Sequence, residues 1–149
     1  MLKIWFIAMR PWSFTATIIP IGLGTALAYQ EGYFFDVYLF ILTLLAGLLV
    51  QAGTNYINTW GDYVSGVDSI ASAVTCPQLV TNILSAAAVK MVGIFCFICS
   101  TCIGLWLTYL CGWPILACGI IGIMGGYCYT AGPSPYKYLG VGSVLVFFL

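Results

Sequence analysis

The chain of 149 residues contains no histidine and very few charged side chains. Four basic and four acidic residues make up 5% of the sequence, and the formal net charge is zero. Without histidine, these residues offer no imidazole for acid–base catalysis, haem binding or a histidine-ligated metal. Without an excess of one charge there is no strong field to attract nucleic acid, so we expect no nucleic-acid partner.

Hydrophobic residues dominate instead, at 62% of the sequence, with a mean hydropathy of +1.08. Such a chain has too few polar side chains to cover a soluble globule, and we expect the lipid bilayer to surround it. Crossing a hydrocarbon layer of about 30 Å takes about 20 apolar residues as a helix. Four runs of this kind lie near residues 12–30, 37–58, 86–111 and 113–129, and a fifth begins at Val141. The sequence therefore predicts an all-α integral membrane protein with a bundle of transmembrane helices.

The few basic residues predict the orientation in the membrane. Lys3 and Arg10 precede the first run and Lys137 follows the fourth, whereas the connections at 31–36 and 111–114 contain no Lys or Arg. Basic residues concentrate in cytoplasmic connections. We therefore expect a cytoplasmic N-terminus in the inner cell membrane, with the connections after the second and fourth runs on the same side.

A polar stretch, TNYINTWGDYVSGVD at 54–68, interrupts the end of the second run. Gln51, Asn55, Asn58 and Asp62 are spaced so that they fall within about 60° of one another on a helix. Polar side chains inside a membrane helix face the bundle interior or a watery cavity rather than lipid. The spacing therefore predicts one polar stripe that faces inward.

The oxygen atoms of this stripe are suited to a hard cation. Mg²⁺ prefers carboxylate and amide oxygens and is commonly held by one or two carboxylates together with substrate phosphates. Asn58 and Asp62 lie one helical turn apart, Gly61 and Gly66 are expected to loosen the helix, and Asp68 can then fold back towards Asp62. The alternative is that the amides only bond between helices and the aspartates are ordinary loop charges.

Three of the seven cysteines invite a different reading, because Cys96, Cys99 and Cys102 have spacing similar to part of an iron–sulfur ligand run. They fall in the middle of an expected membrane helix, and Trp106 stands where a fourth ligand would be sought. Small residues in such helices commonly fill space between neighbours. We interpret these cysteines as packing residues.

Several short motifs together resemble the UbiA superfamily of membrane prenyltransferases. NTWGD at 58–62, followed by Asp68, is similar to the first aspartate-rich motif of that family, except that Thr59 stands where an aspartate is usual. RPW at 10–12 and YTAGPSP at 129–135 resemble the branch that prenylates 1,4-dihydroxy-2-naphthoate in menaquinone synthesis. The resemblance runs over nearly the whole chain.

The resemblance implies a single membrane prenyltransferase domain of about nine transmembrane helices. Residues 1–149 would be its N-terminal part, with four spans and the start of a fifth. The implied reaction is Mg²⁺-dependent transfer of a prenyl group from a polyprenyl diphosphate to an aromatic acceptor, with 1,4-dihydroxy-2-naphthoate as the expected acceptor. The family's second aspartate motif is not among these residues, so we expect residues 1–149 alone to be inactive.

The resemblance also implies roles for individual residues. Asn58 and Asp62 would be the catalytic, metal-linked pair, and Asp68 a third metal ligand. The expected substrate-binding residues are Asn55, which could orient the acceptor, together with Arg10, Tyr129 and Lys137.

Simpler interpretations of two residues stay open at this point. Tyr129 would serve equally well as an interfacial anchor, and Lys137 as an ordinary cytoplasmic charge.

Other functions of the protein stay open as well. The protein could use another acceptor, such as 4-hydroxybenzoate, haem or glycerophosphate. It could instead be a non-enzymatic or transporter protein whose stripe binds an ion, or an inactive remnant.

Overall fold

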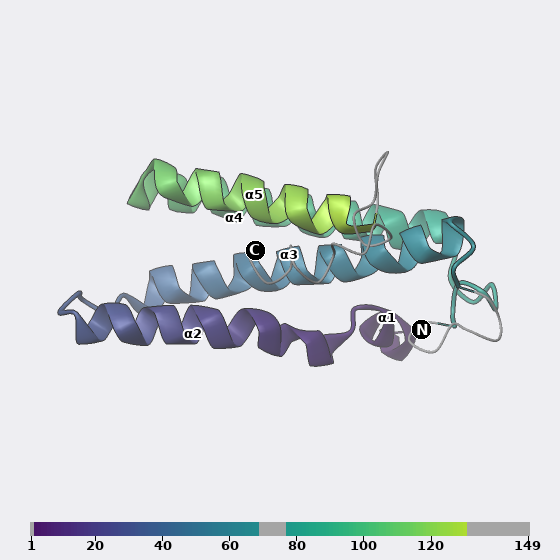
Figure 1. Ribbon diagram of the computed structural model, residues 1–149, viewed down its shortest axis with the longest axis horizontal. Coiled ribbons are helices and arrows are strands. Elements are labelled where there is room, and N and C mark those ends of the chain that lie inside the picture. Colours follow the sequence, from purple (N-terminus) through teal and green to yellow (C-terminus); the bar gives the residue numbers. More distant parts are fainter. Residues whose placement is uncertain (1, 69–76, 131–149) are drawn as a thin grey trace.

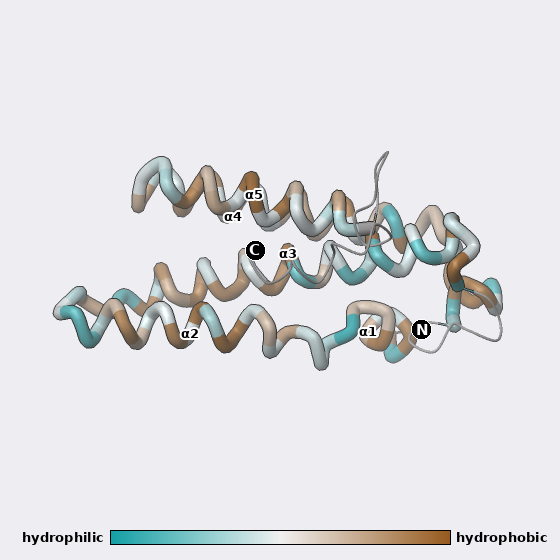
Figure 2. Tube along the Cα trace, viewed as in Figure 1, coloured by the Kyte–Doolittle hydropathy of each residue, from teal (hydrophilic) through white to brown (hydrophobic). Residues whose placement is uncertain are grey.

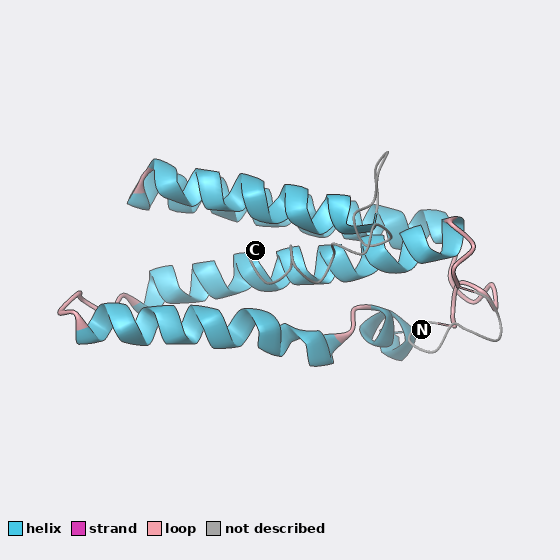
Figure 3. Ribbon diagram, viewed as in Figure 1, coloured by secondary structure: helices cyan, strands magenta, loops and turns pink. Residues whose placement is uncertain are grey.

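The computed structural model describes residues 2–68 and 77–130, and in these ranges it contains helices but no strands (Figures 1 and 3). The elements are α1 (Leu2–Ala8), the 3₁₀ helix η1 (Pro11–Phe14), α2 (Thr15–Gln30), α3 (Val37–Val64), α4 (Ala86–Cys111) and α5 (Trp113–Thr130). The predicted all-α class is confirmed.

Three segments are long and apolar enough to cross a membrane, namely Pro11–Gln30, Val37–Val64 and Ala86–Cys111. The fourth, α5, is shorter: its 18 residues span about 27 Å at about 1.5 Å per residue, close to the thickness of a hydrocarbon core. The four predicted runs are therefore found as helices. The run predicted from Val141 lies outside the described residues.

The start of each long helix after a connection is explained by a local cap. The Asp36 side chain accepts hydrogen bonds from the backbone N–H groups of Tyr38 and Leu39, at 2.8 and 3.1 Å, where α3 begins. Ser85 Oγ accepts one from Ala88 N at 3.2 Å at the start of α4. Side-chain oxygens at these positions satisfy backbone donors that the first helical turn leaves unpaired.

The end of α3 differs from the sequence prediction. Gly61 does not loosen the helix: it is buried within α3, which continues to Val64. The turn comes at Gly66, whose φ of 73° lies in the left-handed region that glycine adopts without a steric penalty. The helix persists through Gly61 because close packing at this level supports its backbone.

Helix α3 lies at the centre and contacts α1, η1, α2, α4 and α5 (Figure 1). Its contact with α4 is close because glycines face side chains there. A Cβ on Gly53 would lie 2.9 Å from the Phe97 ring, and one on Gly93 would lie 3.0 Å from the Ile57 side chain. Small residues of this kind let membrane helices approach one another without a large apolar side chain between them.

Apolar residues predominate along the long helices (Figure 2). Large exposed side chains include Leu23 on α2, Ile41 on α3, Phe95 on α4 and Ile121 on α5. A soluble monomer rarely exposes apolar surface on this scale, whereas a bilayer covers it. The fold is therefore that of an integral membrane protein.

Candidate functional site

The predicted polar stripe is buried near the C-terminal end of α3. Asn55, Asn58 and Asp62 are 7%, 6% and 6% exposed, and Thr59 beside them is fully buried. Tyr56, Ile57 and Gly61 on the remaining faces of this segment are buried as well, and Trp60 is partly buried. Polar groups buried to this extent need partners that compensate for lost water, so the helices around them define the chemistry of the site.

One wall of the site is built by α1 and η1, which are joined to the stripe by hydrogen bonds. Asn55 Nδ2 donates to the Met9 carbonyl and to Ser13 Oγ, both at 2.8 Å. Gln51 Nε2 donates to the same Ser13 hydroxyl at 3.1 Å. The two amides of α3 therefore hold the short N-terminal elements against the polar face.

Arg10 lies in this wall, between α1 and η1. Its guanidinium Nη2 donates to Thr59 Oγ1 at 3.3 Å, and Thr59 is one helical turn from Asp62. The Arg10 backbone has φ 55° and ψ 61°, a left-handed conformation that is uncommon outside glycine. The structure thus brings Arg10, which the sequence assigns to substrate binding, to the stripe that the sequence assigns to the metal.

The chain after α3 folds back onto Asp62, as the sequence predicts. The backbone N–H groups of Val67 and Asp68 donate to the Asp62 carbonyl at 3.0 and 3.1 Å. Asp68 is partly buried. The two aspartates therefore belong to one turn, although they are six residues apart in the sequence.

The remaining predicted residues are on α5 and beyond it. Gly126 of α5 lies against Thr54, and α5 runs parallel to α3 because two reversals separate them. Tyr129, partly buried, follows Gly126 by three residues, about 4.5 Å along the helix, which brings it to the height of the stripe. Lys137 lies outside the described residues.

Sequence reasoning missed three contributors. Ser13 was overlooked, and Thr59 was noted only as a departure from the aspartate-rich motif, because hydroxyl side chains carry little signal; Ser13 directly follows the RPW motif. The third is Lys90, whose Nζ lies 4.2 Å from the centre of the Trp60 ring. This cation–π contact joins the start of α4 to α3 one residue after Thr59.

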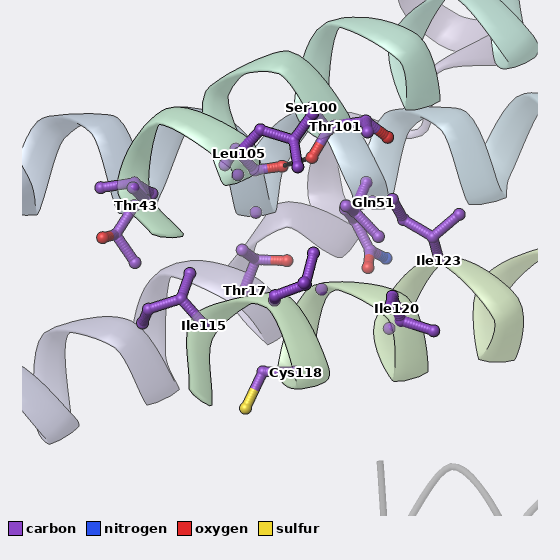
Figure 4. Close-up of a pocket in the computed structure, with 18 of the residues that line it drawn as sticks. Thr17, Thr43, Gln51, Ser100, Thr101, Leu105, Ile115, Cys118, Ile120 and Ile123 are labelled. Carbon is purple, nitrogen blue, oxygen red and sulfur yellow. Dashed lines mark hydrogen bonds between the residues drawn. The ribbon is translucent and has the colours of Figure 1, made fainter. Parts of the chain in front are cut away.

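An apolar cavity of about 600 Å³ lies between α2, α3, α4 and α5 (Figure 4). We call it the apolar groove. Thr43 lies towards one end of it, and Gln51 and Ile123 lie towards the other. Gln51 also donates to Ser13, the partner of Asn55. The groove therefore begins where the polar stripe begins.

Glycines keep part of the groove wall free of side chains. Gly104 of α4 and Gly119 and Gly122 of α5 line the groove, and no atom lies within 4 Å of where a Cβ would be. The arrangement as a whole is a buried polar site with an arginine and two aspartates at one end of a long hydrophobic trough. The groove suits an apolar chain, and the two carboxylates suit a cation that could bridge them to an anionic group.

A model of the UbiA prenyltransferase family matches residues 17–149. The chain belongs to the UbiA prenyltransferase family. UbiA prenyltransferase domain-containing protein 1 from Xenopus tropicalis and from Homo sapiens are each 32% identical over 147 residues, covering 94% of this chain and 41% of theirs.

A second kind of relative is the 1,4-dihydroxy-2-naphthoate octaprenyltransferase of Bacillus subtilis (strain 168). It is 28% identical over 137 residues, which cover 91% of this chain and 43% of that protein. The chain thus spans about two fifths of the length of these UbiA relatives. No solved structure matches it.

UbiA membership confirms the resemblance drawn from the motifs and agrees with the helical membrane fold. The donor atoms of the site also fit Mg²⁺ in kind, since Asn58, Asp62 and Asp68 supply amide and carboxylate oxygens. Residues 2–68 and 77–130 contain no group of three or more His, Cys, Asp or Glu side chains that could hold a metal ion. A magnesium ion here would therefore need further ligands from amides, water or substrate phosphate.

Proposed function

We propose that this chain forms part of a Mg²⁺-dependent prenyltransferase that joins a polyprenyl diphosphate to 1,4-dihydroxy-2-naphthoate in menaquinone synthesis. The observation that carries the proposal is the buried pair Asn58 and Asp62, with the Asp68 backbone hydrogen-bonded to Asp62 and Arg10 hydrogen-bonded to the adjacent Thr59. The names of the relatives support prenyl transfer, and one of them names the naphthoate acceptor.

The reaction breaks the bond between the allylic carbon and the diphosphate oxygen, and pyrophosphate leaves with the electron pair. A carbon of the electron-rich acceptor ring then forms the new carbon–carbon bond, and the ring loses a proton. When bound, Mg²⁺ supplies positive charge where negative charge develops on the departing pyrophosphate. Asn58 and Asp62 would hold it, with Asp68 as a third ligand.

The other residues of the site act on the substrates. The guanidinium of Arg10 can pair with phosphate oxygens, and its planar shape favours two parallel hydrogen bonds. We assign Tyr129 and Lys137 to the mouth of the site near the diphosphate. We assign Asn55 to the substrate site as well; its amide is hydrogen-bonded to Met9 and Ser13, on either side of Arg10 in the sequence.

The apolar groove would take the prenyl tail. Along α3 its lining runs from Gln51 to Thr43, about 12 Å at 1.5 Å per residue. Burying a hydrocarbon chain in such a trough is favourable by about 25 cal/mol per Å² of apolar surface. The tail would then extend from the polar site towards the lipid.

The test is a transfer assay with the protein at its full natural length in lipid vesicles. We expect prenylation of 1,4-dihydroxy-2-naphthoate that stops when divalent cations are chelated and returns with Mg²⁺. If only 4-hydroxybenzoate were prenylated, the assignment of 1,4-dihydroxy-2-naphthoate as the acceptor would be refuted. Transfer that continues without divalent cations would refute the metal assignment, and no transfer to any acceptor would refute the proposed function.

A further inference from the structure

The backbone of Arg10 is in a left-handed conformation that arginine rarely adopts. Its left-handed φ and ψ of 55° and 61° bring the Cβ close to its own backbone, which disfavours the conformation for an arginine. The neighbouring elements, α1 and η1, are only seven and four residues long and cannot impose this geometry alone. Contacts from elsewhere in the fold must stabilise the turn.

Those contacts converge on Ser13. Its backbone N–H and its hydroxyl both donate to the Arg10 carbonyl at 2.9 Å, which closes the turn. The same hydroxyl accepts from Asn55 at 2.8 Å and from Gln51 at 3.1 Å. One donor and two acceptor sites are all that a serine hydroxyl has, so its hydrogen-bonding capacity is full.

Asn55 holds the turn from both sides. Its Nδ2 donates to Ser13 after Arg10 and to the carbonyl of Met9 before it. Because Asn55 is buried on the rigid helix α3, it fixes where the turn lies relative to the stripe. The two residues that accept these hydrogen bonds stand one residue before Arg10 and three residues after it.

The hydrogen bonds of Asn55 and Ser13 fix where the guanidinium of Arg10 lies. One nitrogen, Nη2, donates to Thr59, whose side chain is fully buried. The Nε atom of Arg10 is also buried and has no hydrogen-bond partner among residues 2–68 and 77–130. A buried cationic donor without an acceptor is costly, and an anionic oxygen would satisfy it.

We propose that Ser13 and Asn55 are positioning residues for Arg10, and that they hold its guanidinium ready for the diphosphate of the prenyl donor. This inference rests on the proposed function. It changes the expected role of Asn55, which acts on the diphosphate through Arg10 rather than on the aromatic acceptor. Thr59 completes the arrangement as the protein acceptor that orients one edge of the guanidinium.

The experiment removes the hydroxyl in the full-length protein with Ser13→Ala and measures three constants. These are KM for the prenyl diphosphate, KM for the aromatic acceptor, and the inhibition constant of inorganic pyrophosphate. We expect the first and third to rise roughly tenfold, as for the loss of one hydrogen bond to a charged group, with the acceptor KM unchanged. Ser13→Thr, which restores a hydroxyl, should return both to within about twofold.

Two comparisons separate positioning from a general structural defect. Thr15→Ala removes a nearby exposed hydroxyl that donates to the Trp12 carbonyl at 3.2 Å, and it should change none of the constants. In a protein that carries Arg10→Gln, Ser13→Ala should have almost no further effect, because the side chain that it positions is gone. Should Ser13→Ala fail to fold, Ser13→Cys takes its place, since its thiol is a weaker donor and acceptor of similar size.

The proposal is overturned if Ser13→Ala raises the acceptor KM instead, or if its effect is undiminished beside Arg10→Gln. If the wild-type protein transfers no prenyl group, the proposed function fails, but the positioning can still be decided. Calorimetric binding of inorganic pyrophosphate with Mg²⁺ then takes the place of the kinetic constants. Weaker binding in Ser13→Ala supports the proposal, and equal binding, or no binding to wild type, refutes it.

Discussion

The two halves of α3 have opposite relations to their surroundings. From Val37 to Val50 the helix is almost wholly apolar, yet none of these residues is buried by the protein. From Ala52 to Asp62 it carries two asparagines, two threonines and an aspartate, and nearly every residue is buried. The other helices thus enclose the polar half more fully than the apolar half.

This difference reverses the pattern of a soluble protein and has a simple cause. Lipid tails solvate apolar side chains as well as a protein core does, so the first half gains little from protein contacts. Amides and carboxylates have no partners in hydrocarbon, and the second half must find them within the bundle. The other helices pack around the polar half because its amides and carboxylates are costly to expose to lipid.

The comparison predicts that the largest effects on activity come from the polar half. Asp62→Asn keeps size and polarity but removes a negative charge at the proposed metal site. We expect transfer by the full-length protein to fall by roughly two to three orders of magnitude, or about 2.7–4 kcal/mol. Tyr63→Phe, about 100° away around the helix, is the matched control and should stay near wild type. Equal activity of the two variants would make Asp62 an ordinary charge.

The second-largest effect is expected on stability, when a methyl group is added where the polar half of α3 packs closely against α4. A Cβ at Gly53 would meet the Phe97 ring at 2.9 Å and the Gly93 carbonyl oxygen at 3.1 Å, so Gly53→Ala should destabilise the fold by about 1–3 kcal/mol. Gly104→Ala, where nothing lies within 4 Å, should be tolerated. Thermal unfolding of the detergent-solubilised protein measures both. A Gly104→Ala variant as unstable as Gly53→Ala would contradict the packing described here.

A smaller change in stability is expected when isoleucine is shortened to valine at two positions of α3. Ile57 is fully buried in the polar half, whereas Ile41 is 55% exposed in the apolar half. Ile57→Val should lower the free energy of unfolding by about 0.5–1.5 kcal/mol, and Ile41→Val should change it by less than about 0.5 kcal/mol. The same unfolding assay applies. Losses of the same size at both positions would show that the two halves are equally packed.

The two ends of α3 should lie on opposite sides of the membrane. The distribution of positive charge over Lys3, Arg10 and Lys137 predicts that the polar end of α3 faces the cytoplasm. A topology reporter fused near Asp68 should therefore be cytoplasmic, and one fused near Gly32 should lie on the opposite side of the membrane. The reverse labelling would invert the assigned orientation of the site.

The sequence by itself determined the membrane class, the four helices and the inward-facing stripe. These depend on hydropathy and on helical periodicity, which are local properties of the chain. The cap at Asp36 and the turn at Gly66 are local in the same sense. The prediction at Gly61 was wrong, because the weak local preference of glycine was overridden by the packing around α3.

Only the tertiary structure decided what surrounds the stripe. Asn55 and Ser13 are 42 residues apart, and Arg10 and Thr59 are 49 apart, so no periodicity links them. Their meeting depends on how α1 and η1 lie across α3. A buried amide takes whichever partner the packed helices bring to it, and that choice is a property of the whole fold rather than of any segment.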